Sequence, residues 1–216
     1  EIVNVDLVEK VIFDALHCKC HYLFVSHSLF KKTGDVGKER NVLFNGGYCL
    51  SKFFTTDNGL SSSLINKIYQ DRNGMVWIAT EDGLNRYDGS KITIYKHDPI
   101  DKNSLCHNFV STLFEDREGR LFVGTYNGIQ MYNPETDKFS DNAIWNDGKP
   151  FRSDCSACTQ LRNGEIWLSG NVPCKLRVED GELIVSPLES PVPEGSIEEV
   201  MEDAFGRIWL IIAGDK

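Results

Sequence analysis

The stretch YQDRNGMVWIATEDGLNRYDG, residues 69–89, opens with a polar turn, continues into an apolar run around Trp77, and breaks at Asp82-Gly83. The same skeleton returns 45 residues later as FEDREGRLFVGTYNGIQMYNP, residues 114–134. In both copies an acid, two polar residues and a glycine precede a β-rich run, a threonine, a glycine turn and a further apolar run. One copy would predict a β-hairpin, whereas several copies at a fixed period predict a repeat architecture.

The turn glycine marks four registers of this pattern. It recurs at intervals of 45, 45 and 42 residues, and an aromatic residue follows it by three positions each time: Gly74, Gly119, Gly164 and Gly206 with Trp77, Phe122, Trp167 and Trp209. An acid precedes the glycine by three positions in every copy except the third, which has Leu161. A period of roughly 40–50 residues with several strands per unit is typical of propeller blades.

Each unit contains four short runs rich in β-branched and aromatic residues, as in residues 64–71, 75–80, 84–88 and 91–96. Such runs, separated by Gly and Asp turns, predict four-stranded antiparallel sheets. A sheet of this kind covers its faces by stacking on its neighbours, so the repeated aromatic residues are predicted to pack between blades. The sequence therefore predicts an all-β fold, with repeat cores near residues 64–96, 109–140, 154–188 and 196–216.

Between residues 41 and 216 there is room for nearly four blades, and the fourth stops where its third strand is expected. Residues 47–56, GYCLSKFFTT, are predicted to form the outer strand of a blade completed by residues outside this chain. Residues 1–40 do not follow the repeat and are predicted to be an irregular segment. We expect a fragment of a larger ring, with an exposed apolar blade face that favours poor stability or self-association.

Composition excludes several functional classes. The net charge of −9 and the lack of a basic stripe argue against nucleic-acid binding. No run approaches the roughly 20 apolar residues of a membrane-spanning helix. The chain begins with Glu1, so we expect that any targeting segment has been removed.

Seven cysteines leave an odd number and give little support to a disulfide framework. The cluster HCKCH, residues 17–21, places its potential zinc ligands too close together for one tetrahedral ion. The CSAC motif, Cys155 to Cys158, falls on a predicted strand and not at a helix N-terminus, where a thiol would be activated. We therefore predict no metal site, no redox site and no cofactor.

Residues 53–139 carry a resemblance to a known family, the two-component regulator propeller repeat. In that family a Gly-Leu-Ser-Ser segment leads into an Asp-x-x-Gly turn, a Trp-[Ile/Val]-Gly-Thr strand and a further Gly turn. Gly59-Leu60-Ser61 and residues 68–88 follow this cycle, except that Ala79 replaces the usual glycine, which Gly124 restores in the second unit. The third and fourth units are degenerate.

The resemblance implies the periplasmic sensor region of Bacteroidetes-type hybrid two-component systems. Such sensors are rings of blades, often seven per ring, and their proteins continue into a membrane helix, a histidine kinase, a receiver and a DNA-binding region. They respond to oligosaccharides. This segment would then be periplasmic, part of a membrane-anchored parent, and without kinase activity of its own. Residues 1–40 depart from the family pattern.

A ligand-sensing, non-enzymatic propeller is the leading hypothesis, with an oligosaccharide or other small ligand and the downstream kinase domains as partners. Propellers bind at one end of their channel, so the candidate ligand-binding residues lie on the turns between second and third strands: Glu81, Asp82, Tyr126, Asn127 and Asn171. An aromatic face with an adjacent amide suits a sugar. The plainer alternative is that these residues only form turns.

The connection at residues 96–108 is long and polar and is a further candidate, in which His97 and His107 are predicted to be surface residues. Two other classes of function stay open. A propeller lyase or hydrolase would need an acid/base constellation that the repeat does not supply, so no catalytic residue is predicted. A protein-interaction scaffold is the other alternative. Whether a ligand would bind within one chain or across a homodimer is left open by the sequence.

Overall fold

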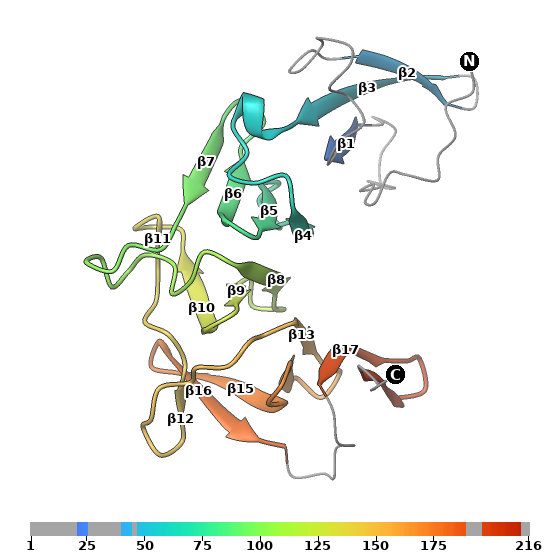
Figure 1. The fold of residues 1–216 in the computed structure, drawn as a ribbon. Coiled ribbons are helices and arrows are strands. Elements are labelled where there is room, and N and C mark those ends of the chain that lie inside the picture. Colours follow the sequence, from blue (N-terminus) through green and yellow to red (C-terminus); the bar gives the residue numbers. More distant parts are fainter. Residues whose placement is uncertain (1–20, 26–39, 45–46, 189–195, 213–216) are drawn as a thin grey trace.

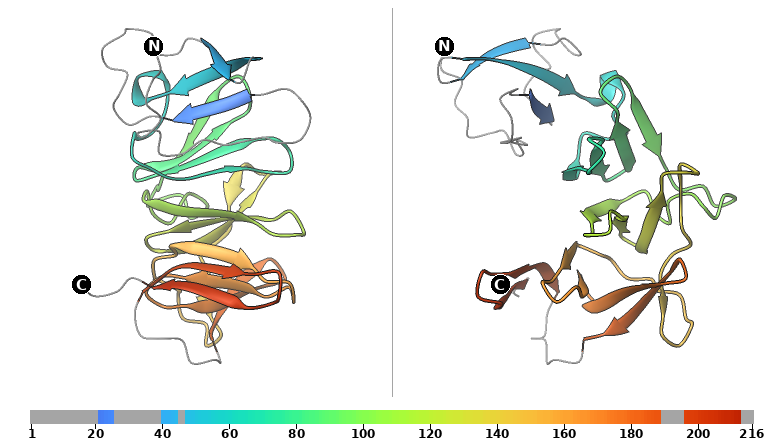
Figure 2. Two further views of the ribbon diagram at one scale, coloured as in Figure 1. Left: turned by 90° about the vertical axis from the view of Figure 1, so that its right-hand side faces the viewer. Right: turned by 180° about the vertical axis from the view of Figure 1, so that it is seen from behind.

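The structure is a computed structural model of the 216-residue chain, and it describes residues 21–25, 40–44, 47–188 and 196–212. Within these ranges the chain forms β-strands and turns, with one short 3-10 helix, η1, at Thr56–Asn58. Figure 1 shows the sheets following one another along an arc, and Figure 2 shows the same sheets stacked face to face. The all-β fold predicted from the sequence is confirmed.

The first two complete blades are four-stranded antiparallel sheets, as predicted. The first blade contains β4 (Ile65–Gln70), β5 (Val76–Thr80), β6 (Gly83–Tyr87) and β7 (Ile92–Tyr95), in that spatial order. The second contains β8 (Val110–Glu115), β9 (Leu121–Thr125), β10 (Gly128–Asn133) and the two-residue β11 (Lys138–Phe139). The first strand of each blade lies on the inner side of the arc and the last strand on the outer side (Figure 1).

The third blade has one strand more than the sequence predicts. Its regular strands are β13 (Ala157–Gln160), β14 (Ile166–Ser169), β15 (Cys174–Glu179) and β16 (Glu182–Pro187). A fifth strand, β12 (Ile144–Trp145), comes from the connection after the second blade and pairs in parallel with β16. Trp145 and the buried Phe151, whose rings lie 5.3 Å apart, pack in the same core cluster as Leu176 and Val185 of the third blade.

The fourth unit is a two-stranded ribbon within the described residues. It consists of β17 (Ile197–Glu202) and β18 (Ile208–Ile212), paired antiparallel. The inner face of β17 packs on the third blade, since Ile197 and Val200 are buried.

A three-stranded sheet precedes the first blade. It contains β1 (His21–Val25), β2 (Arg40–Phe44) and β3 (Gly47–Phe54), with β3 in the middle, parallel to β1 and antiparallel to β2. The prediction that residues 47–56 form an outer strand is therefore wrong, because both edges of β3 are paired by runs from earlier in the chain. The rest of residues 1–40, including residues 17–20 of the HCKCH cluster, lies outside the described residues.

The core is divided among the interfaces between sheets. Trp77 of the first blade is fully buried against the second blade, with its ring 4.8 Å from that of Tyr132. Phe122 is likewise fully buried, in a cluster that joins the second and third blades. The predicted role of these two aromatic residues as packing between blades is confirmed. Among the described residues, no helix has the length and apolar character needed to cross a membrane.

Candidate ligand-binding face

The turn between the second and third strands is built in the same way in the first two blades. The buried Thr80 hydroxyl donates to the carbonyl of Gly83 at 2.8 Å and accepts the amide N–H of Asp82 at 3.2 Å. The same contacts recur in the second blade in Thr125, Asn127 and Gly128. The sequence therefore presents Glu81-Asp82 and Tyr126-Asn127 on matching scaffolds.

The end of the connection between β7 and β8 holds these two turns together. The carbonyl of Asn108 accepts the amide of Gly83 at 2.7 Å, and the carbonyl of Phe109 accepts the amide of Tyr126 at 3.1 Å. The Asp82 carboxylate accepts from Lys96 at 2.6 Å and from the Asn108 side chain at 3.2 Å. Consecutive connection residues thus bridge the first and second blades at this end of the strands.

Tyr126 is the most prominent side chain of this face. It is 64% exposed, and its ring centroid lies 5.8 Å from His107 and 6.1 Å from Phe109. Because the main chain is pinned by the threonine turn and by Phe109, the ring stands on a rigid base. An exposed, rigid aromatic face with amide and carboxylate groups nearby suits a ligand that has both C–H faces and hydroxyls.

The two histidines of the connection stabilise the loop. A ring nitrogen of His97 is 2.6 Å from the carbonyl of Leu105, and Nδ1 of His107 accepts the amide of Phe109 at 2.9 Å. His97 is exposed, as predicted, whereas His107 is partly buried against Tyr126.

The third blade makes the corresponding turn with other residues. Gly170 replaces the threonine, and its φ of +145° places it in a region that favours glycine. The amide of Asn171 donates to the carboxylate of Asp154 at 3.2 Å, and the next residue, Cys155, donates its amide to the carbonyl of Thr125 at 3.1 Å. All five predicted ligand-binding residues therefore lie on equivalent turns of three consecutive blades, and main-chain bonds link each turn to the next blade. Whether they bind a ligand stays a prediction.

The opposite end of the strands carries a set of contacts that the sequence reasoning missed. An arginine two positions before the turn glycine donates to main-chain carbonyls of the next blade's turn: Arg72 to Asp116 and Arg117, Arg117 to Leu161 and Arg162, and Arg162 to Ala204. The amide of each arginine donates to a side chain of the next blade, at Glu115, Gln160 and Glu202. The signal was the recurrence of arginine at the 45-residue period.

A polar cluster closes the outer part of the interface between the first two blades. The Arg86 guanidinium lies 5.6 Å from the Trp77 ring and 2.7 Å from Asp137, which also accepts from the hydroxyls of Tyr95 and Tyr132. Burial opposes ionisation of Asp137, but these hydrogen bonds outweigh it and hold the pKa of its carboxyl below the usual value. Burial, then the bond to Asp137, raises the pKa of the Tyr95 hydroxyl. The cluster is satisfied internally and is structural.

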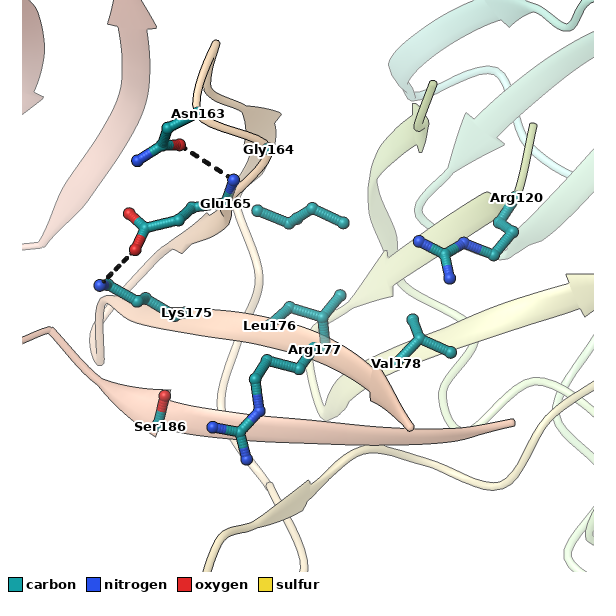
Figure 3. A pocket seen from close by; sticks show the side chains of 10 residues that line it. Arg120, Asn163, Gly164, Glu165, Lys175, Leu176, Arg177, Val178 and Ser186 are labelled. Atoms are coloured by element: carbon teal, nitrogen blue, oxygen red, sulfur yellow. Dashed lines mark hydrogen bonds and ion pairs between the residues drawn. The ribbon is translucent and has the colours of Figure 1, made fainter. Parts of the chain in front are cut away.

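A hollow of about 490 Å³ lies beside the third blade. It is lined by Arg120 and by residues of the third blade that include Glu165, Lys175, Arg177 and Ser186 (Figure 3). Lys175 is 2.6 Å from Glu165, Arg177 is 3.1 Å from Glu179, and Arg120 is 2.6 Å from Asp116. Because each cation has a carboxylate partner, the hollow offers no uncompensated positive charge. The better candidate for ligand binding is the surface formed by the turns that carry Glu81, Asp82, Tyr126, Asn127 and Asn171, which we call the Tyr126 face.

The CSAC motif is not an activated thiol pair. Cys155 and Cys174 are buried, and burial raises the pKa of both thiols, to about 12 for Cys174. Cys158 lies on β13, as predicted, and burial raises the pKa of its thiol well above the usual value. Thiols without thiolate character are unreactive. No group of three or more potential metal ligands occurs in the part of the chain that the structure describes.

Comparison with known proteins identifies the repeat. The family model described as "Two component regulator propeller" matches residues 59–82 and 104–127, which run up to the threonine turns of the first and second blades. These two stretches are therefore similar to the two-component regulator propeller repeat. Over 54 residues, 25% of its length, the chain is 44% identical to "Histidine kinase P4" of Formosa agariphila, of which it covers 4%.

Solved structures share the fold of this propeller. The extracellular domain of the hybrid two component system BT3049 from B. thetaiotaomicron matches 88% of the chain with a TM-score of 0.57 and 20% identity. That of BT4673 from the same organism matches 71% with a TM-score of 0.59 and 20% identity. The chain spans 23% of each domain. Virginiamycin B lyase from Staphylococcus aureus matches 79% of this chain and 55% of its own length, with a TM-score of 0.53 and 13% identity.

Proposed function

We propose that this chain is the ligand-sensing part of an extracytoplasmic propeller in a two-component sensor. The ligand is an oligosaccharide bound at the Tyr126 face, and the signal passes to a histidine kinase outside these residues. The segment itself is non-enzymatic and belongs to a periplasmic, membrane-anchored parent. This proposal draws on the family match and on the similar proteins, which are named as extracellular domains of hybrid two component systems and as a histidine kinase.

The observation that carries the choice of face is the exposure of Tyr126 on a main chain that hydrogen bonds fix. The ring is 64% exposed, the amide of Tyr126 bonds to Phe109, and the rings of His107 and Phe109 flank the tyrosine. Such a ring loses little conformational entropy when a ligand binds, so it is an effective surface for stacking. Asn127 beside it and Asn171 on the next blade add amide groups that read hydroxyls.

The test is a thermal-shift screen of the parent's extracytoplasmic region against cellohexaose, xylohexaose, mannohexaose and chondroitin hexasaccharide. A ligand present at 100 times its dissociation constant adds about 2.7 kcal/mol to the free energy of unfolding. We expect Tyr126→Ala to abolish the shift. The matched control is Ile94→Ala, which removes a 43% exposed apolar side chain from the outer strand β7 and should leave the shift intact.

The alternatives give different outcomes in the same experiment. A sugar that binds and is then consumed would favour a propeller lyase or hydrolase. Absence of any shift across the panel would favour an interaction scaffold. A shift that survives Tyr126→Ala would move the site away from this face. Sedimentation of the protein with and without the bound sugar would test for a homodimer.

A further inference from the structure

The ribbon β17–β18 exposes an apolar surface at the place where earlier blades are covered. Trp209 corresponds to Trp77 and Phe122, which are fully buried by the following blade, yet Trp209 is 53% exposed. Three exposed apolar side chains of the ribbon lie on the same side as Trp209: Met201, Phe205 and Ile211. We call these four residues the ribbon face. The two earlier blades show that a further sheet is the kind of element that covers such a face.

A residue at the start of the first strand of each preceding blade bonds to the next blade. The side chain of Asn66 donates to the carbonyl of Val110 at 2.8 Å, and Ser111 and Ser156 donate to the carbonyls of Cys155 and Ile197. Register shifts place Asn66 and Ser111 in bulges, which aim a side chain out of the regular alternation. The donor in each contact is a neutral amide or hydroxyl.

Glu198 occupies the same bulge position on β17. The register of the ribbon shifts between Ile197 and Glu199, as it does around Asn66, and Glu198 is exposed. An ionised carboxylate has no proton to donate, and a main-chain carbonyl opposite it would repel it. Glu198 therefore cannot form the side-chain-to-carbonyl hydrogen bond that joins the internal blades. Its carboxylate needs a hydrogen-bond donor on the partner that covers the ribbon.

The arginine contact also ends at this ribbon. Arg72, Arg117 and Arg162 each reach the carbonyls of the next turn, but the equivalent position in the ribbon is Ala204. Glu199, next to Glu198, is exposed as well, and the ribbon's only basic residue among those described, Arg207, is 2.6 Å from Asp203. The edge of the ribbon face is thus acidic.

We propose that the ribbon face docks a β-sheet blade that presents a lysine or arginine to Glu198, in place of the main-chain carbonyl used between the internal blades. The apolar centre matches the sheet-on-sheet packing around Trp77 and Phe122, and the acidic edge selects a basic partner residue. This inference rests on the proposal that the chain is one segment of a larger propeller. It does not depend on which ligand that propeller binds.

The experiment compares the melting temperature of Glu198→Lys and Glu198→Ser in the full-length parent and in the 216-residue chain. A basic partner makes Glu198→Lys unfavourable, so the melting temperature of the parent should fall by about 2 °C while that of the isolated chain is unchanged. Glu198→Ser should lower it less. Glu182→Lys is the matched control, because Glu182 is exposed on β16 and away from the ribbon.

Other outcomes overturn the proposal. A rise in the parent's melting temperature with Glu198→Ser would mean that a carbonyl faces this position, as between the internal blades. Equal melting temperatures of wild type, Glu198→Lys and Glu198→Ser in the parent would mean that no charged group lies opposite Glu198. Concentration-dependent dimerisation of the 216-residue chain that Glu198→Lys disrupts would identify a second copy as the occupant. This experiment does not measure sugar binding. Its result therefore stays valid if the proposed ligand turns out to be wrong.

Discussion

The indole N–H of Trp167 donates a hydrogen bond to the carboxylate of Glu165 at 3.1 Å, two residues before it in the chain. In the first blade the same indole position, Trp77, donates instead to Asp71 at 2.8 Å, the acid at the start of the turn. Leu161 takes the place of that acid in the third blade and is buried. The irregular unit therefore keeps the indole contact by moving the carboxylate to the other side of the turn glycine.

Replacing Glu165 by alanine should lower the free energy of unfolding by about 1–2 kcal/mol, because both the Trp167 indole and the Lys175 ammonium lose their acceptor. Urea unfolding of the purified chain measures this. Glu179→Ala is the control: Glu179 pairs with Arg177, both side chains are about half exposed, and its loss should change stability by about 0.5 kcal/mol or less. Equal effects of the two variants would contradict a special role for Glu165.

The arginine contacts between turns should contribute measurably to the stacking of the blades. Arg117→Met removes two bonds of 3.1 Å to the carbonyls of Leu161 and Arg162, and should lower the free energy of unfolding by about 1–2 kcal/mol. Arg117→Lys should recover only part of this, because an ammonium lacks the planar fork. Arg152→Met, at an exposed site, is the control in the same urea titration. Full recovery by lysine would show that charge alone is needed.

Most of the fold could be predicted from the repeat period of the sequence, because packing between blades depends on a few large side chains at fixed positions in each repeat. The recurrence of a large aromatic residue after 45 residues, at Trp77 and Phe122, predicted that both would be buried. Short elements escape this reasoning. The strand β12 has only two residues, and it is held by pairing with β16, about 40 residues later, and by the packing of Trp145 in the core cluster that includes Val185.

The candidate site could also be predicted only in part. Turn residues such as Asp82 and Tyr126 could be placed at one end of the strands from the hairpin pattern alone. The contribution of the connection could not, since the contacts of His107 and Phe109 with Tyr126 join a loop to a turn that lies two strands further along the sequence. A repeated arginine was visible in the sequence, but its carbonyl partners are main-chain atoms, which carry no residue-type signal.

Gly128 should be far less tolerant of substitution than Gly148. A Cβ at Gly128 would lie 2.2 Å from Oδ1 of Asn142, whose side chain is fixed by bonds to Asn127 and Phe151, and the φ of +126° is itself unfavourable. Gly128→Ala should cost about 2–3 kcal/mol. Gly148 has a φ of +80° but nothing within 4 Å, so Gly148→Ala should cost about 1 kcal/mol. Equal urea midpoints for the two variants would refute the steric argument.

Stability should be lost in acid through turn aspartates. A hydrogen bond from the Trp209 indole, then bonds from Arg207 and Phe205, lower the pKa of Asp203 to about 2, and bonds from Lys91 and Ser90 do the same for Asp88. A carboxyl whose pKa is lower when folded contributes stability that is complete above its unfolded pKa, near 3.9, and is lost as pH falls towards 2. The urea midpoint should therefore hold between about pH 7 and 5 and decline below about pH 4. Asp203→Asn should start lower at neutral pH and decline less steeply, because one titrating group is gone. A variant that declines as steeply as the wild type would exclude Asp203 as a source of the acid sensitivity.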